Sequence, residues 1–395
     1  MTFIADKIKV KKIIALTICL CVLSACKKEP LWEKKIESDI NALRGIRPNP
    51  SFLTGAGATA GTSQCINDSD HPVQSSSPFT TPIFHDDFST SKDPACYTIK
   101  PKCLIRGDWS MPGDCPFDET LPRYSGLKKL DKCTWRVWHD GSSMSNVVTM
   151  ADGVEVSYSS DVGRNTLKLK MVPNPDYNPS KGQCGTIDST QPGNYNMNCP
   201  LIAGAVDSNY VDSQHHGQNA LYGRIEMTAR FLTTTSNASY PALWMWPEKL
   251  GDGYPLTATA AEQVPHGSYF EPKHIGELDI LESNGRSDKD YAFQSYHQWD
   301  TSNSNAFVTR GRVVHMSDWH IYGVEWTNGY LKFYIDGCYT YQINRNDKSN
   351  YGNTGIPLSI SDTASFMMMT LATDGGAVDP NNRDIFEIKD VTVFK

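Results

Sequence analysis

The segment from His320 to Ile335 reads HIYGVEWTNGYLKFYI and places two runs rich in β-branched and aromatic residues on either side of Asn328-Gly329. Asn-Gly between two such runs is a strong signal for an antiparallel hairpin. Long helical periodicity is absent, so the sequence predicts an all-β fold, an antiparallel β-sandwich or barrel. Short runs of the same kind recur between Gly, Asn and Asp residues, at Val154–Tyr158, Thr166–Met171, Gly223–Phe231, Ala242–Trp246, Glu277–Glu282, Phe366–Leu371 and Ile385–Phe394.

The first residues have the features of an export signal. A basic stretch ending at Lys12 precedes an apolar run from Ile13 to Val22, which is too short to span a bilayer as a permanent helix. Leu-Ser-Ala-Cys, ending at Cys26, resembles the bacterial lipobox, whose cysteine is acylated. We therefore expect residues 1–25 to be a lipoprotein signal peptide and Cys26 to anchor the protein in the cell envelope, at the outer membrane or cell surface. The alternative is an ordinary secretory signal cut near Ala25.

The exported chain is acidic. The formal net charge of −7 at pH 7 becomes about −10 when residues 1–25, with a net charge of +3, are removed. An acidic chain repels a phosphate backbone, so we do not expect a nucleic-acid partner. Residues 26–80 have the Gly, Ala, Ser, Thr and Pro composition of a tether. Residues 81–395 are predicted to be one domain, long enough for a large core and expected to be monomeric.

Eight cysteines remain after the signal peptide and Cys26 are set aside: Cys65, Cys96, Cys103, Cys115, Cys133, Cys184, Cys199 and Cys338. An even number in an exported chain favours disulfides. We predict only the pair Cys184–Cys199 specifically, because both residues lie in one excursion rich in Gly, Asn and Pro. Zinc is the alternative for clustered cysteines, but the chain has no Cys-x-x-Cys pair, so thiol ligation of a metal is not expected.

The segment Gly276–Glu282, GELDILE, carries three carboxylates within six residues. On a strand, Glu277 and Asp279 share one face, whereas a regular strand would turn Glu282 toward the core. A one-residue bulge near Ile280-Leu281 returns Glu282 to the acidic face, and bulges are frequent beside active sites. Carboxylates this close repel one another unless one holds a proton, which suits a site with one nucleophilic carboxylate and one acid. The alternative is a polar strand that faces water.

In this context the sequence resembles the family 16 glycoside hydrolases, the laminarinase and agarase clan, whose bulged branch has the signature Glu-x-Asp-x-x-Glu. The similarity implies a β-jelly roll with a substrate cleft across its concave sheet. The similar segments follow in order from Phe84 to Phe394: His85–Phe88, Tyr222–Glu226, Tyr240–Trp244, Glu277–Glu282, Tyr296-His297, Trp319–Trp326 and Phe333–Gly337.

The resemblance implies that Glu277 is the nucleophile, Glu282 the general acid/base, and Asp279 the group that holds a proton or hydrogen bond between them. A retaining hydrolase has its two carboxyl groups about 5–5.5 Å apart. Strand rise alone would separate the Cα atoms of Glu277 and Glu282 by about 13 Å, so the sheet must curve to bring them together.

Aromatic residues follow the same pattern. Tyr240, Trp244 and Trp246 are evenly spaced and therefore share one face of a strand, where their rings can stack on sugars. The alternative is that they fill the sandwich core. The position of His297 implies a hydrogen bond to the catalytic acids or to the sugar, although a lone histidine can also be purely structural. His215-His216 has no carboxylate at metal spacing and is predicted to be surface.

The sequence departs from the family at several positions. Tyr240 replaces the usual Trp, the segment between Trp246 and Gly276 is longer than in typical members, and Thr370 replaces an Asn or Gln. Where many members have an aspartate ligand for a structural calcium, this chain has Lys389 followed by Asp390. We therefore expect no cofactor and do not assume calcium.

These features predict a retaining endo-glycoside hydrolase of β-1,3- or β-1,3/1,4-glucan. Galactans such as agarose are the nearest alternative substrates, and a glucan transglycosylase would share the same residues. The non-enzymatic alternative is a carbohydrate-binding envelope lipoprotein. The three clustered acids argue against it, because uncompensated buried charge costs stability that a binding protein would not need to lose.

Overall fold

The structure is a computed structural model, and the described residues belong to one compact unit, Ala60–Lys395. The described residues are 77–89, 93–100, 102–104, 113–114, 121–138, 147–180, 184, 198–209, 217–233, 239–247, 249–250, 254–255, 276–283, 291–299, 305–352, 355, 357–362, 364–373, 379 and 381–395. The predicted signal peptide, Cys26, the tether assigned to residues 26–80 except for its last four, and His215-His216 lie outside them. Among the described residues, no helix is long and apolar enough to cross a membrane.

One sheet has ten strands in the order β20-β19-β18-β11-β23-β7-β8-β5, with β1 paired to β23 and β6 paired to β7. Its strands are β1 (Pro82–Asp86), β5 (Val147–Thr149), β6 (Val154–Ser159), β7 (Arg164–Pro173), β8 (Leu201–Ala203), β11 (Gly223–Leu232), β18 (His320–Trp326), β19 (Tyr330–Ile335), β20 (Cys338–Asn344) and β23 (Ile385–Phe394).

A second sheet has eleven strands in the order β21-β17-β16-β15-β12-β22-β9-β4-β2-β3, with β10 paired to β22. Its strands are β2 (Lys102–Leu104), β3 (Gly113–Asp114), β4 (Arg136–Trp138), β9 (Ala205–Asp207), β10 (Asn219–Ala220), β12 (Ser239–Pro247), β15 (Gly276–Glu282), β16 (Tyr291–Trp299), β17 (Asn305–Val313), β21 (Tyr351–Gly352) and β22 (Ser365–Thr373). The remaining elements are the pair β13 (Lys249–Leu250) and β14 (Tyr254–Pro255), and the short helices α3 (Ala95–Thr98), η2 (Pro122–Lys129) and η3 (Ala151–Gly153).

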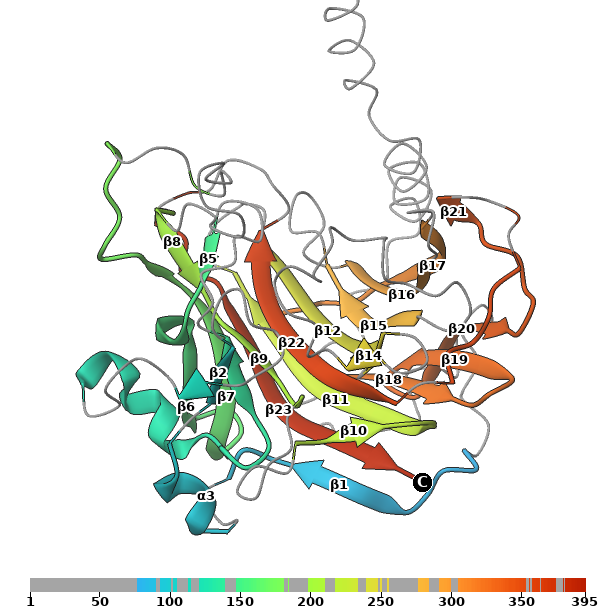
Figure 1. Cartoon of the computed structure of the whole chain (residues 1–395), viewed down its shortest axis with the longest axis horizontal. Coiled ribbons are helices and arrows are strands. Elements are labelled where there is room, and N and C mark those ends of the chain that lie inside the picture. Colours follow the sequence, from blue (N-terminus) through green and yellow to red (C-terminus); the bar gives the residue numbers. More distant parts are fainter. Residues whose placement is uncertain are drawn as a thin grey trace, which may run out of the picture. The chain divides into compact units, whose positions relative to one another are not determined.

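The two sheets pack face to face around one core, and their long strands are curved (Figure 1). Strand β11 alternates strictly, with Ile225, Met227, Ala229 and Phe231 buried and the residues between them partly exposed. Burying a large aliphatic or aromatic side chain contributes about 1.5–3 kcal/mol, so this alternation fixes which face of each strand points inward. The described strand pairs are antiparallel except β2–β4 and β5–β8. The predicted antiparallel β-sandwich is confirmed.

The hairpin predicted at Asn328-Gly329 is present as β18–β19. Its turn does not use the positive φ angles that Asn-Gly favours, because neither residue has one. Instead, the hydroxyl of Thr327 accepts hydrogen bonds from the backbone N–H groups of Gly329 and Tyr330, at 3.1 and 2.9 Å. A threonine side chain thus closes the turn.

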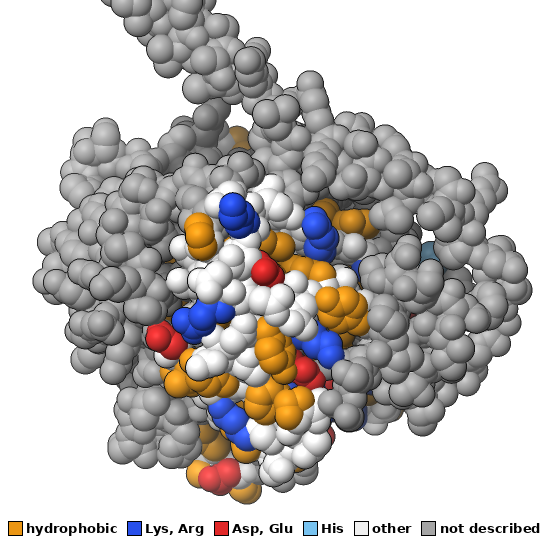
Figure 2. Space-filling model, turned by 90° about the vertical axis from the view of Figure 1, so that its right-hand side faces the viewer, with side chains coloured by type: hydrophobic (Ala, Val, Ile, Leu, Met, Phe, Trp, Pro, Cys, Tyr) orange, Lys and Arg blue, Asp and Glu red, His pale blue; other side chains and the backbone are white. Residues whose placement is uncertain are grey.

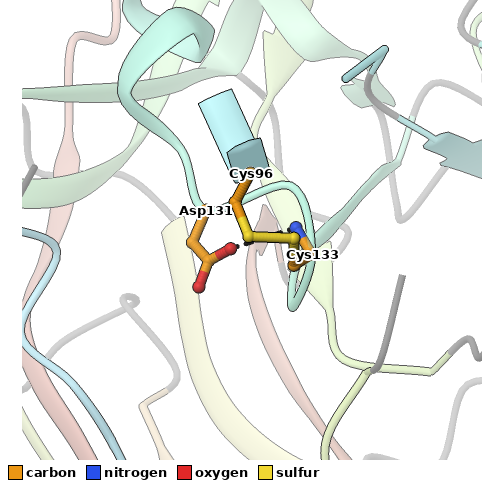
Figure 3. Close-up of side chains that lie close together, drawn as sticks. All are labelled: Cys96, Asp131 and Cys133. Atoms are coloured by element: carbon orange, nitrogen blue, oxygen red, sulfur yellow. Dashed lines mark hydrogen bonds between the residues drawn. A yellow bond between two sulfur atoms is a disulfide. The ribbon is translucent and has the colours of Figure 1, made fainter. Parts of the chain in front are cut away.

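Two disulfides join described cysteines. Cys184 is bonded to Cys199, as predicted, and Cys96 is bonded to Cys133, a pair that the sequence did not specify. Figure 3 shows the carboxylate of Asp131 beside the second disulfide, where it accepts a hydrogen bond of 3.0 Å from the backbone N–H of Cys133. Because both sulfur atoms are oxidised, this cluster offers no thiolate for a metal. Cys338 is disulfide-bonded as well.

Candidate active site

Strand β15 carries the predicted bulge. On the β16 side, Asp279 pairs with Ser295 and Glu282 pairs with Phe293, so two residues of β15 lie opposite the single residue Gln294. On the β12 side, Asp279 pairs with Trp244 and Leu281 with Leu243, which leaves Ile280 without a partner. Ile280 is therefore the extra residue.

The bulge turns two consecutive side chains toward the core. Ile280 and Leu281 are both fully buried within the main core cluster. As a result, Glu282 lies on the same face of the sheet as Glu277 and Asp279, and the one-residue bulge expected from the sequence is confirmed.

Asp279 is the most deeply buried of the three acids, with 1% of its surface exposed, whereas Glu277 and Glu282 are partly exposed. Burial, with the charges of Glu282 and Glu277, raises the pKa of Asp279 well above its ordinary value. The carboxyl group of Asp279 therefore holds a proton more tightly than an aspartate that is exposed to water.

His297 lies on β16 directly opposite Glu277, and its Nε2 atom is 3.1 Å from Oδ2 of Asp279. Burial alone favours the neutral ring, but contact with Asp279 and the charges of Glu277 and Glu282 outweigh it and raise the pKa of His297 to about 10. The ring stacks on Phe307 of β17 at a centroid distance of 4.6 Å, which fixes its plane. The histidine and the three acids thus form one proton-sharing cluster.

Tyr240 of β12 donates a hydrogen bond of 2.7 Å from its hydroxyl to Oε1 of Glu282. Burial and the charge of Glu282 raise the pKa of Tyr240 well above its ordinary value, so the hydroxyl remains a donor. The sequence predicted Tyr240 as a residue that stacks on sugar; the structure places its hydroxyl on the carboxylate cluster.

Trp244 and Trp246 lie on the same face of β12 as Tyr240, half-buried and in edge-to-face contact at a centroid distance of 6.0 Å. They are not part of the core between the sheets. They pack instead against a second apolar cluster on the outer face of the sheet, which includes Trp138 and Met368. The Nε1 atom of Trp244 donates to the hydroxyl of Thr370 at 3.3 Å. These rings therefore lie on the carboxylate side of β12.

Sequence reasoning missed the far end of this face. Met368 of β22 is paired with Trp244 of β12 on one side and with Asp207 of β9 on the other. The carboxylate of Asp207 is fully buried and accepts hydrogen bonds from Arg136 at 2.9–3.1 Å and from the indole of Trp138. A sequence signal for this face was available. Trp135 and Val137 point into the core, and the residues that alternate with them, Arg136 and Trp138, lie on the opposite face.

The cluster offers metal-ligand atoms as well as protons. One atom each from Asp279, Glu282 and His297 lies within 4.8 Å of the others. In this arrangement, however, His297 faces Asp279 and the hydroxyl of Tyr240 faces Glu282. These contacts direct the donors and acceptors of the cluster toward one another.

The position at which the family resemblance would put a calcium ligand already faces a cation. The guanidinium of Arg164 donates to the backbone carbonyls of Asp87 and Lys389 and to the carboxylate of Asp390. Calcium is bound by oxygen ligands, whereas these oxygens accept hydrogen bonds from a guanidinium. The residues present therefore fit an arginine better than calcium.

The fold and the carboxylate cluster together have the features of the glycoside hydrolase class, in which two carboxyl groups flank the scissile bond. Residues 201–379 match the family model described as glycosyl hydrolases family 16. The matched segment covers less than half of the chain and includes the carboxylate cluster.

Two curated relatives match part of the chain. Glucan endo-1,3-beta-glucosidase A1 of Niallia circulans is 26% identical over 185 residues, which are 44% of this chain and 24% of the relative. Keratan-sulfate endo-1,4-beta-galactosidase of Sphingobacterium multivorum is 27% identical over 124 residues, which are 30% of this chain and 25% of the relative. The chain thus spans about a quarter of the length of these relatives. The crystal structure of LamAcat from Zobellia galactanivorans aligns with a TM-score of 0.45 at 19% identity, over 80% of this chain and 98% of that one.

Proposed function

We propose that the protein is a retaining endo-glycoside hydrolase of β-1,3- or β-1,3/1,4-glucan, with Glu277 as nucleophile and Glu282 as general acid/base. The observation that carries the proposal is the bulged strand, which presents Glu277, Asp279 and Glu282 on one sheet face beside His297. A double-displacement mechanism requires two carboxyl groups, one as nucleophile and one as acid and base, and the third carboxyl group here is coupled to both.

In the first step, the carboxylate of Glu277 attacks the anomeric carbon, the glycosidic C–O bond breaks, and Glu282 gives its proton to the departing oxygen. In the second step, the ionised Glu282 takes a proton from water. The water oxygen attacks the anomeric carbon and releases Glu277. The hydrogen bond from Tyr240 fixes the orientation of the Glu282 carboxyl group in both steps.

The tryptophan pair supports a polysaccharide substrate. Trp244 and Trp246 lie next to the carboxylates on the same face, and half-buried indole rings can stack on the C–H faces of sugar rings.

Figure 2 shows basic, acidic and hydrophobic side chains interspersed on one side of the molecule. The described side chains there do not form the basic surface that a nucleic-acid backbone would require.

A β-galactan is the second candidate substrate, because one curated relative is named as an endo-1,4-beta-galactosidase. Glucan transglycosylation would use the same first step, with a sugar hydroxyl in place of water in the second. A carbohydrate-binding protein without catalysis remains the candidate from a different class.

A panel of purified polysaccharides tests the substrate. We expect β-1,3-glucan and mixed-linkage β-1,3/1,4-glucan to yield series of oligosaccharides of several lengths, identified by mass, because an endo-acting enzyme cuts within the chain. With an oligosaccharide of the same glucan as substrate, transglycosylation would give products longer than that oligosaccharide. Cleavage of agarose or another galactan with no cleavage of glucan would overturn the glucan assignment, and binding without any product would overturn the enzyme assignment.

Replacing Asp279 with Asn tests the coupling of the cluster. Asp279→Asn keeps the shape of the side chain but removes an ionisable group that, when deprotonated, raises the pKa of His297. The remaining groups should then release their protons at lower pH, so the pH–rate profile should shift toward lower pH. The rate should fall on the order of 10²-fold, the lower end of what general acid–base catalysis contributes. Wild-type and variant profiles that coincide would contradict the coupling.

A further inference from the structure

Gln294 is a polar side chain with no exposed surface, and it lies opposite the bulge of β15. Its neighbours on β16, Phe293 and Ser295, pair with Glu282 and Asp279. Because successive side chains of a strand alternate, Gln294 points to the other face of the sheet, into the core. A buried amide in a hydrophobic core costs stability unless it is hydrogen-bonded.

The amide nitrogen of Gln294 donates toward three backbone carbonyls from three different strands. The shortest of these bonds, 3.0 Å, goes to the carbonyl of Ile280, the extra residue of the bulge. The others go to Tyr334 of β19 at 3.2 Å and Gly323 of β18 at 3.4 Å. Gln294 therefore ties the bulge to the opposite sheet across the core.

The Gln294 main chain is held as well. The hydroxyl of Tyr341 on β20 donates to the carbonyl of Gln294 at 2.7 Å, with a longer contact of 3.4 Å to Val308. Residues of the ten-stranded sheet thus hold Gln294 of β16 both through its side chain and through its backbone.

The bulge decides where Glu282 points. Without the extra residue, the two-residue period of the strand would return Glu282 to the core side, because register shifts of one residue reverse every side chain. Ile280 has no register partner on β12, and its carbonyl accepts the 3.0 Å hydrogen bond from the Gln294 amide. An unbonded buried carbonyl would favour rearrangement of the bulge.

We propose that Gln294 is a positioning residue that maintains the β15 bulge and thereby keeps Glu282 on the catalytic face. The proposal rests on the proposed function of Glu282 as general acid/base. Gln294 touches no reacting atom, and it acts through the carbonyl of Ile280.

The test is Gln294→Met, which keeps the length and approximate volume of the side chain but removes the donor. Two rates are measured: cleavage of β-glucan, and the burst of aryl alcohol released in one turnover of an aryl β-glycoside with a good leaving group. The first rate needs the proton of Glu282, whereas the burst needs only the nucleophile. We expect the ratio of glucan rate to burst rate to fall by about 10²-fold, the effect of displacing a reacting group by about an ångström.

Tyr296→Phe is the matched control. Tyr296 lies on the same strand and core face as Gln294. Its hydroxyl donates to the carbonyl of Ser359 and accepts from the backbone N–H of Ser361, away from the bulge. Tyr296→Phe should lower the melting temperature without changing the ratio of glucan rate to burst rate. Equal losses of both rates in Gln294→Met, or a ratio equal to that of Tyr296→Phe, would overturn the positioning role.

If Gln294→Met is not recovered folded, Tyr341→Phe takes its place. This variant removes the hydrogen bond to the Gln294 carbonyl, and we expect a smaller fall of the same ratio. An unchanged ratio would overturn the proposal. Failure of the wild-type protein to cleave any polysaccharide would instead contradict the proposed function, and the positioning role would fall with it.

Discussion

Replacing Glu282 with Ala should lower the rate of glucan cleavage by about 10²–10⁴-fold, the contribution of a general acid/base. The variant retains Glu277, so an aryl β-glycoside with a good leaving group should still glycosylate the enzyme. Hydrolysis of that intermediate should then be slow, because the base is missing. Added azide needs no base and occupies the space left by the carboxylate. It should restore turnover and give the β-glycosyl azide, with retained configuration.

The matched control for this experiment is Glu155→Ala. Glu155 lies on β6 of the other sheet, where its partly exposed carboxylate pairs with Lys170. An exposed ion pair contributes about 0–1 kcal/mol, so this variant should keep its activity and show no azide effect. Azide products from the control, or full glucan activity in Glu282→Ala, would contradict the role assigned to Glu282.

The carboxylate face could be predicted because its geometry is local. The alternation of Glu277 and Asp279 with buried Leu278 follows from the two-residue period of a strand. The offset of Glu282 then required a bulge, and both neighbouring strands have the corresponding register shift. Short-range spacing was sufficient because all of these residues lie on one strand.

Contacts between strands were beyond the sequence. The hydrogen bond of Tyr240 to Glu282 spans 42 residues, and that of Gln294 to Tyr334 spans 40. Alternation predicts which face a side chain occupies, but not which strand lies beside it or which sheet lies opposite. For this reason the sequence predicted that the ring of Tyr240 stacks on sugars but not that its hydroxyl contacts Glu282, and it gave no role to Gln294.

Turns and disulfides have the same limit. Cys184 and Cys199 are separated by 15 residues within one excursion, whereas Cys96 and Cys133 are 37 residues apart and meet only in the folded chain. Asp336-Gly337, with φ angles of 55° and 73°, joins Ile335 of β19 to Cys338 of β20 with the positive angles that a tight hairpin favours. Asp336-Gly337 was therefore a usable turn signal in the sequence. In the preceding Asn-Gly turn, the hydroxyl of Thr327 instead closes the turn by a hydrogen bond.

Replacing Glu277 with Ala should abolish the double displacement, because no group remains to form the glycosyl-enzyme bond. The rate on glucan should fall at least as far as in Glu282→Ala, by about 10²–10⁴-fold or more. The truncation leaves a cavity on the face of the sugar opposite the leaving group. Azide in that cavity can attack an activated β-glycoside directly, while Glu282 still supplies its proton, and the product should be the α-glycosyl azide, with inverted configuration.

Proton NMR of the product distinguishes the two anomers. Opposite anomers from the two variants would exchange the roles of Glu277 and Glu282. Full hydrolysis by either variant would show that its glutamate is not catalytic.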